Sequence, residues 1–435
     1  MRSAKIKIFG VCLVTLFLSG LAIAQGEDQQ LLERIKTLEA RLAELEGKAL
    51  TSEGTNAVSS KVAIIGGTNE ASKSLEWLTQ NKISGFASVS YLHNFDRRAS
   101  SVAGRSFDIN DGFSLNKFKV TFEKPVEFTP EKWDAGYRAD LIFGQDAALI
   151  QSGYGKAPAG GTPKFNLGDH GDLEQLFATV NVPIGRGLQV SAGKMVTLMG
   201  VEVIEETANP NFSEGNQFLF VENFTSTGVQ LNYKWSDKID TQIRVFNGWD
   251  VVKDNNSARS YMGRIGFAPD DKTSLALIAY GGPEQDNNSS AWRKGIEFVG
   301  SRKITSKLTA WVQGDYGRED KNPVLPVPTK DAEWWAGGAW LSYDFCDKVG
   351  LALRGDYLND KEGARTSGSP FTSPIAANTG MELSSFTLTL NWKPYKGLQV
   401  RPEMRWDTDW GSVAGGAFNA RRNQFTAGLG IAYLF

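Results

Sequence analysis

Cysteine and histidine are both scarce in this chain of 435 residues, because each occurs only twice. Cys12 lies in the N-terminal segment and Cys346 is the other cysteine, so the sequence offers no framework of intramolecular disulfides. His93 and His170 stand without a spaced set of metal ligands or catalytic partners. We therefore expect no metal site, no cofactor and no enzymatic activity.

Long apolar runs are also missing, apart from one near the N-terminus. It spans Ile8 to Leu18, follows the basic residues Arg2, Lys5 and Lys7, and precedes a small-residue cleavage pattern that ends at Ala24. This order is typical of a secretory signal peptide, so residues 1–24 are expected to be removed after export. Since no later stretch is long and apolar enough for a spanning helix, a helical membrane protein is excluded.

Neither sign of charge dominates the composition. The chain has 47 basic and 49 acidic residues, and loss of the three basic signal residues leaves 44 against 49, a net charge of −5. No basic run remains that would favour nucleic acid as a partner. Proline is modest at 15, whereas glycine reaches 46 and tryptophan 12. This mildly polar composition suits a barrel whose strands show only half their side chains to lipid.

The C-terminal stretch shows the clearest local pattern. From Asn423 to Phe435, every second residue is apolar and most of the residues between are small or polar. A period of two predicts a strand with one apolar face. An apolar last strand that carries aromatic residues is typical of an outer-membrane barrel, whose outer face lies in lipid.

Comparable stretches recur through the chain, and their connections alternate in length. Every second connection is short, and the others are long, as in barrels with periplasmic turns and extracellular loops. Most candidates have the 9–13 residues that a tilted strand needs to cross a bilayer. An even number of strands places both ends of the barrel on the periplasmic side. The sixteen candidates are 82–94, 113–123, 133–143, 172–182, 188–195, 226–235, 239–250, 260–268, 273–282, 291–301, 306–318, 332–345, 349–359, 381–393, 398–409 and 423–435.

The sequence thus predicts an all-β fold, a transmembrane antiparallel barrel of about 16 strands over residues 82–435. Apolar residues are expected to face lipid and polar residues a wide, hydrated interior. Three strands alternate less cleanly, 113–123, 188–195 and 332–345, and a bulge or a shifted register is expected there. Aromatic residues near strand ends are expected in the interfacial girdles: Trp235, Trp249, Trp292, Trp392, Trp406 and Tyr433.

One short helical segment precedes the barrel. Leucine and isoleucine recur in steps of four and three from Leu31 to Leu45, which predicts a short coiled coil within residues 25–48. Residues 49–81 are rich in small and polar residues and are interpreted as a linker. A coiled coil of this length is marginal alone. It would lie in the periplasm and help a homotrimer to assemble, or it is a lone amphipathic helix.

From about Ser88 onward the chain resembles the putative beta-barrel porin-2 (OmpL-like) family of bacterial outer-membrane proteins. The resemblance is carried by the segments 136–141 (GYRADL), 192–194 (AGK), 247–250 (NGWD) with 254–256 (DNN), and 282–284 (GPE). It implies a porin-like barrel in the outer membrane of Gram-negative bacteria. These motifs are marks of fold rather than of substrate, and the heptad segment lies outside the resemblance.

Alternation also assigns charged residues to the barrel interior. Ten basic and eight acidic side chains would face inward, which predicts a mixed-charge lumen. An alternative stays open, because pairs two residues apart, such as Arg354 and Asp356, could merely neutralise each other along a strand. Lys117 and Lys119 belong to this inward set. The candidate pore-lining residues are Arg138, Asp140, Arg244, Arg264, Arg293, Glu297, Arg354, Asp356, Arg401, Glu403 and Arg405.

The third outer loop, from Met195 to Thr225, is the longest connection. Loops of this length are usually functional. We expect it to fold into the barrel and narrow it, with its acids facing the basic wall; the alternative is an outward cap or a subunit contact. Its candidate constriction residues are Glu202, Glu205, Glu206 and Glu214. The acidic and amide patches at 254–256 and 286–288 could hold Ca²⁺, but turn composition alone also predicts them.

Together these features predict an outer-membrane channel that passes ions and small hydrophilic solutes by diffusion, with membrane lipid around it. A channel selective for phosphate or another anion remains an alternative, and so does a barrel that mainly anchors or adheres. A phospholipase would need a serine and histidine pair on the lipid-facing rim, for which His93 beside Ser88 and Ser90 is the nearest candidate.

Overall fold

The computed structural model describes residues 80–96, 102–103, 107, 110–150, 170–321, 330–366, 380–411, 416–418 and 421–435. The predicted signal peptide, the coiled coil and the linker up to residue 79 lie outside the described residues.

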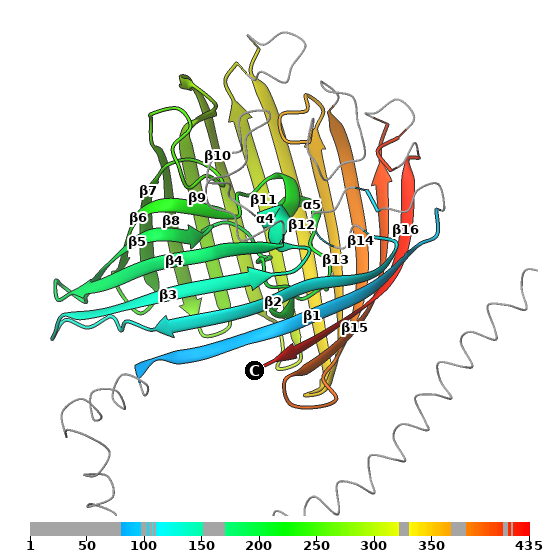
Figure 1. The fold of residues 1–435 in the computed structure, drawn as a ribbon, viewed down its shortest axis with the longest axis horizontal. Coiled ribbons are helices and arrows are strands. Elements are labelled where there is room, and N and C mark those ends of the chain that lie inside the picture. Colours follow the sequence, from blue (N-terminus) through cyan, green and yellow to red (C-terminus); the bar gives the residue numbers. More distant parts are fainter. Residues whose placement is uncertain are drawn as a thin grey trace, which may run out of the picture. The chain divides into compact units, whose positions relative to one another are not determined.

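The described chain forms one closed barrel in which every neighbouring pair of strands is antiparallel (Figure 1). The strands follow sequence order around the barrel, and β1 pairs with β16 to close it. Gly85 and Phe435 exchange two backbone hydrogen bonds of 3.0 Å at this seam. The strands are β1 (Lys82–Asn94), β2 (Gly112–Lys124), β3 (Asp134–Phe143), β4 (Gly171–Val182), β5 (Leu188–Val196), β6 (Thr225–Lys234), β7 (Ile239–Phe246), β8 (Ser260–Asp270), β9 (Thr273–Gln285), β10 (Asn288–Lys303), β11 (Leu308–Glu319), β12 (Ala332–Cys346), β13 (Val349–Asp360), β14 (Met381–Trp392), β15 (Leu398–Asp409) and β16 (Asn423–Leu434).

All sixteen predicted strands are present, and most of their ends agree within two residues. The largest errors are at β7, which ends at Phe246 rather than residue 250, and at the connection of β9 to β10. There β9 ends at Gln285 rather than residue 282 and β10 begins at Asn288 rather than residue 291, because residues 286–287 alone join the two strands. At β7, strand-like residues continue into a turn. Asp250 lies just beyond β7 with a φ of 56°, which no strand residue adopts.

The outer face of the barrel is apolar, as the alternation predicts. On β6, Val229 and Leu231 are exposed, whereas Gln230 and Asn232 between them are buried. On β15, Met404 and Trp406 are exposed on either side of the buried Arg405. Since a strand turns successive side chains to opposite faces, the charged set points inward and the apolar set outward.

Bulges explain part of the irregular patterning. In β2, the register against β1 shifts at Ser88/Val89, so that Asn116 and Lys117 are both buried although they are consecutive. A second shift between β3 and β4 leaves Glu174 and Gln175 both buried on β4. The expected irregularity in 113–123 is therefore confirmed as a bulge, while the one in β4 was not predicted. In β12, the register shifts near the end, between Asp344 and Cys346.

The interior is not uniformly polar. The prediction that apolar residues face only lipid and that polar residues fill the interior is therefore wrong in part. Trp249, predicted in a girdle, is buried with Tyr280, at 5.1 Å between ring centroids. Trp334 is fully buried and packs with Phe220 of the third loop in an apolar cluster. The other predicted girdle residues differ from Trp249. Trp235, Trp292, Trp406 and Tyr433 are exposed, and Trp392 is half-buried.

The described parts of the outer connections contain three short helical segments: α4 (Ala147–Ile150), η1 (Glu206–Ala208) and α5 (Asn216–Phe220). Figure 1 shows α4 and α5 within the ring of strands. Among the residues that the structure describes, no helix is long and apolar enough to cross a membrane.

Candidate functional site

The third outer loop lies inside the barrel. We call residues 197–224 loop 3; it includes η1 and α5, and its two ends meet through a hydrogen bond of 3.0 Å from Thr197 N to the Phe224 carbonyl. All five residues of α5 are buried, and α5 contacts β12, β13 and β14. A loop that reaches strands so distant from its own ends must cross the interior.

The first contact that holds loop 3 to the barrel wall lies close to its N-terminal end. The Gly200 and Val201 amides donate to the Glu297 and Gln313 side chains, at 2.8 Å and 2.9 Å. Gly200 has a φ of +91°, which side-chain-bearing residues rarely adopt. A Cβ there would also overlap the Glu222 carboxylate. The chain therefore needs glycine at the point where loop 3 turns onto the wall.

Glu202 and Arg354 form the central contact between loop 3 and the wall. Arg354 Nη1 donates to Glu202 Oε1 at 2.7 Å, and neither side chain is exposed by more than 1%. The same oxygen accepts from Trp340 Nε1 at 3.1 Å, while Oε2 accepts from the Gly215 amide at 2.6 Å. Arg354 also donates to the Ser213 carbonyl. A buried pair with all these partners fixes the path of the loop.

The charged residues of β15 hold the backbone of loop 3. Arg401 Nη2 donates to the carbonyls of Asn209 and Pro210 at 2.8 Å and 2.9 Å. Glu403 accepts from the Phe212 amide at 2.8 Å. Arg405 Nη1 donates to the Glu214 carbonyl at 2.6 Å. These side chains face inward as predicted, but loop 3 buries them.

Ion pairs two residues apart are also present along the strands. Arg138 lies 3.0 Å from Asp140, Arg354 3.1 Å from Asp356, and Arg405 2.7 Å from Asp407. The alternative interpretation of these pairs therefore has a real structural basis. It is incomplete, because Arg354 and Arg405 donate to loop 3 as well.

Three acids meet where loop 3 touches β10 and β11, and no basic side chain of the described residues forms an ion pair with them. Glu297 and Asp315 are directly opposite on neighbouring strands, and Glu222 of loop 3 joins them through Gln313. Gln313 Nε2 donates to Glu222 at 2.8 Å and lies 3.3 Å from both other carboxylates. Burial, then the nearby Asp315 carboxylate, raises the pKa of Glu222 well above its ordinary range.

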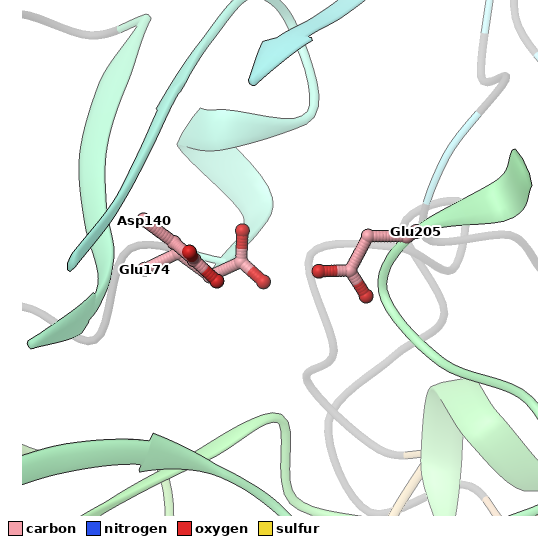
Figure 2. A group of neighbouring side chains, drawn as sticks. All are labelled: Asp140, Glu174 and Glu205. Carbon is pink, nitrogen blue, oxygen red and sulfur yellow. The ribbon is translucent and has the colours of Figure 1, made fainter. Parts of the chain in front are cut away.

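A second acidic group surrounds Lys119 on the opposite side of the interior. Figure 2 shows Asp140 and Glu174 side by side, with the Glu205 carboxylate of loop 3 pointing toward them. Lys119 Nζ lies 3.0 Å from Asp140 and 3.1 Å from Glu174, and it also pairs with Glu205. The ammonium group thus occupies the place that a cation would take among the three carboxylates.

The sequence did not predict Glu174 as an interior residue, because strict alternation along the strand does not turn it inward. The bulge in β4 turns Glu174 inward together with Gln175. The signal available in the sequence was that three of the four residues 172–175 are polar, Leu173 being the exception, but bulges are set by the register of neighbouring strands. Glu206, by contrast, was predicted and pairs with Lys117 at 2.6 Å.

The remaining predicted lumen arginines form no ion pair or hydrogen bond with loop 3. Arg264 pairs with Asp240 at 2.6 Å. Arg293 pairs with Glu319 at 2.9 Å and stacks over Trp249 at 4.9 Å from the ring centroid. Arg244 differs from both, because it donates to Gln230 and to the Val196 carbonyl, at 2.7 Å and 2.8 Å, and to no carboxylate of the described residues.

Two cavities lie between loop 3 and the strands β1 to β7. The larger, of about 490 Å³, is lined by residues that include Lys119, Arg138 and Glu205. The smaller, of about 310 Å³, is lined by Arg244 and by neutral polar side chains of β4 to β7. Gln175, Phe177 and Val196 line both cavities, so the two spaces adjoin.

Two weaker candidates from the sequence are not assembled into sites. His93 lies on the opposite face of β1 from the buried Ser88 and Ser90, so no serine and histidine pair forms on the rim. Asp254 accepts from the amides of Asn256 and Ser257, both at 2.8 Å, and pairs with Arg259. These contacts are those of a turn.

Comparisons with known proteins agree with this architecture. The family model of putative beta-barrel porin-2, OmpL-like, matches residues 80–435. No curated protein sequence matches the chain.

Three solved structures share the barrel fold. An anion-selective porin from Comamonas acidovorans is 8% identical, with a TM-score of 0.55, over 82% of this chain and 99% of that one. OmpF of Salmonella typhi, in complex with daunomycin, is 9% identical, with a TM-score of 0.53, over 82% and 97%. The outer-membrane channel DcaP of Acinetobacter baumannii is 12% identical, with a TM-score of 0.51, over 82% and 97%.

At these identities the structural likeness shows the fold alone, whereas the family model covers the whole described barrel. The chain therefore belongs to the putative beta-barrel porin-2, OmpL-like family, and it is a porin-type β-barrel of the outer membrane.

Proposed function

We propose that the protein is a passive diffusion channel for ions and small hydrophilic solutes, in which loop 3 narrows a mixed-charge lumen. The observation that carries the proposal is that acids of loop 3 meet basic residues of the wall. Glu202 pairs with Arg354, Glu205 with Lys119 and Glu206 with Lys117. Such contacts hold a loop across the lumen instead of leaving it over the mouth.

In this proposal solutes pass on the side of the barrel formed by β1 to β7. The two adjoining cavities lie there, and the charged and polar side chains among their lining residues suit hydrated solutes. The residues on the other side of the interior bind loop 3 and hold it against the wall. We call them the seat of loop 3: Arg354, Asp356, Arg401, Glu403 and Arg405. Arg138, Asp140 and Glu205 border the passage, where their charges would set ion preference.

Planar-bilayer recording of the full-length protein tests this function. A diffusion channel gives stable conductance steps that rise in proportion to salt concentration, and it admits small sugars into proteoliposomes at rates that fall with sugar size. A folded barrel that inserts but gives neither conductance nor sugar entry would contradict the proposal and favour a structural anchor.

We also propose that the mature chain starts after residue 24, lies with its N-terminal segment in the periplasm, and assembles as a homotrimer. Heptad spacing within residues 25–48 and the even strand number support this. Chemical cross-linking of the protein in membranes tests it: a trimer band that persists on dilution is expected. Monomer alone in intact membranes would contradict the trimer.

A further inference from the structure

The smaller cavity has a composition unlike the rest of the interior. We call it the Arg244 pocket and define it by Gln175, Ser191, Gln230, Asn232, Gln242 and Arg244, which come from four neighbouring strands. Among the residues that the structure describes, no acidic side chain lines it, and Arg244 is its one charged residue. Its volume of about 310 Å³ is at the lower end of the range of small-molecule sites, roughly 300–1,000 Å³.

Arg244 is buried, with 2% of its surface exposed, yet it has no counter-ion among the described residues. Five of the other predicted lumen arginines each pair with a carboxylate: Arg138, Arg264, Arg293, Arg354 and Arg405. Arg401 pairs with none, but its Nε, Nη1 and Nη2 all donate to Asn391 or to backbone carbonyls of loop 3. An uncompensated buried cation is costly, so a chain keeps one where an anion can reach it.

The geometry of Arg244 leaves donors for such an anion. A guanidinium has five N–H groups. The Nε–H group donates a hydrogen bond to Gln230, and one Nη1–H group donates to the Val196 carbonyl. Three N–H groups therefore remain. They can hold one planar oxyanion. A single guanidinium among neutral amides matches a single negative charge better than two.

The rest of the pocket offers hydrogen bonds and an apolar surface. Gln242 lies two residues from Arg244 on β7, opposite Asn232 on β6, and its amide has no hydrogen-bond partner in the described part of the chain. Ser191 and Thr179 add hydroxyl groups. Phe177 and Phe128 line the same space.

The turn after β2 completes the pocket. It comprises residues 125–133 and is longer than the other turns at the same end of the barrel. Its backbone carbonyls accept hydrogen bonds of 2.9 Å from barrel side chains, Val126 from Gln189 and Thr129 from Asn181. The turn therefore lies against the wall and brings Phe128 to the pocket.

We propose that the Arg244 pocket is a binding subsite for small hydroxylated monocarboxylates, such as sugar acids, on their way through the channel. Arg244 binds the carboxylate, the amides of Gln242 and Asn232 bind hydroxyl groups, and the phenylalanines contact the carbon chain. This inference rests on the proposed channel function, which it deepens by naming a solute class.

The experiment uses the full chain in planar bilayers with potassium chloride, and gluconate as the probe. Gluconate is expected to lower the chloride-carried conductance in a saturable way, while sorbitol, its uncharged counterpart, has a much weaker effect. Arg244→Gln is expected to weaken the gluconate effect about tenfold or more, because a charge-assisted hydrogen bond is lost. Arg264→Gln, which removes a lumen arginine that has a counter-ion, is the matched control and should leave it unchanged.

Calorimetric titration of the detergent-solubilised protein with gluconate gives the same comparison without conductance. If Arg244→Gln does not fold, Gln242→Ala replaces it, with a smaller loss of gluconate affinity expected.

Gluconate binding that is absent, or equal in wild type and variants, overturns the subsite. Tighter binding of inorganic phosphate than of gluconate overturns the solute class. Normal salt conductance without gluconate binding would defeat the subsite alone, whereas a barrel without any conductance defeats the channel.

Discussion

The two sides of the barrel interior carry similar residues by alternation but use them differently. On β10 to β15, the inward charges are buried beneath loop 3 and bind its side chains and backbone. On β3 to β7, inward residues line cavities, and three N–H groups of Arg244 have no acceptor in the described part of the chain. An inward position therefore does not imply a water-lined one, because a long loop can turn half of a lumen into a protein core.

The largest effect is expected from breaking the seat of loop 3. Arg354→Ala removes the partner of Glu202 and leaves buried acids uncompensated, which costs about 3–5 kcal/mol in comparable pairs. Loop 3 should leave the wall, so single-channel conductance should rise and protease should cut the loop in the folded barrel.

Arg264→Ala is the matched control, because its pair with Asp240 is partly exposed and worth about 1 kcal/mol or less. Arg354→Ala with unchanged conductance and an uncut loop would show that the Glu202 contact does not hold loop 3.

A smaller effect is expected at the turn where loop 3 meets the wall. Gly200→Ala puts a side chain at φ +91° and against Glu222, at a cost of about 1–3 kcal/mol. Channel openings should become noisier, with brief steps of higher conductance. Gly355→Ala is the control, since a Cβ there meets nothing within 4 Å. Quiet, wild-type recordings from Gly200→Ala would mean that the turn tolerates a side chain.

The acidic contact of loop 3 makes its seating depend on pH. The raised pKa of Glu222 means that the protonated acid is favoured when the loop is seated. The stabilisation is complete below the ordinary pKa of about 4.3 and is lost as pH rises through the raised pKa. Conductance should therefore increase with pH over that window.

Glu222→Gln should remove most of this pH dependence, because the amide resembles the neutral acid. A variant that retains the full wild-type dependence would assign it to other groups. Asp237→Asn, in an exposed turn, is the control and should leave the curve unchanged.

The smallest effect is expected in ion preference. Glu205→Gln removes one of three carboxylates around Lys119, beside the larger cavity. The reversal potential in a potassium chloride gradient should move toward anion preference with little change in conductance. The same potential in Glu205→Gln and wild type would place the passage elsewhere. Arg401→Ala would not test ion preference in the same way. Arg401 binds the backbone of loop 3, so its loss would also move the loop.

The fold could be predicted from the sequence because alternation and connection length are local features. Val229, Leu231, Met404 and Trp406 were assigned to the outer face correctly. The site could be predicted only in part. Trp249 was expected at the interface, and Trp334 lies in a strand, 332–345, that alternates less cleanly. Both pack inside, because loop 3 supplies an apolar partner there. Glu174 was missed, since the polar residues around it do not locate a bulge, whose place depends on the register of the neighbouring strand.

Thiol accessibility tests the difference between the two sides most directly. In a Cys346→Ser background, single cysteines replace Gln242, on the cavity side, and Thr387, which is buried beside Arg354. A water-soluble methanethiosulfonate reagent added during bilayer recording should reduce the current through Gln242→Cys and leave Thr387→Cys unchanged. Equal reaction at both positions, or reaction at Thr387→Cys alone, would contradict a passage confined to the β1 to β7 side.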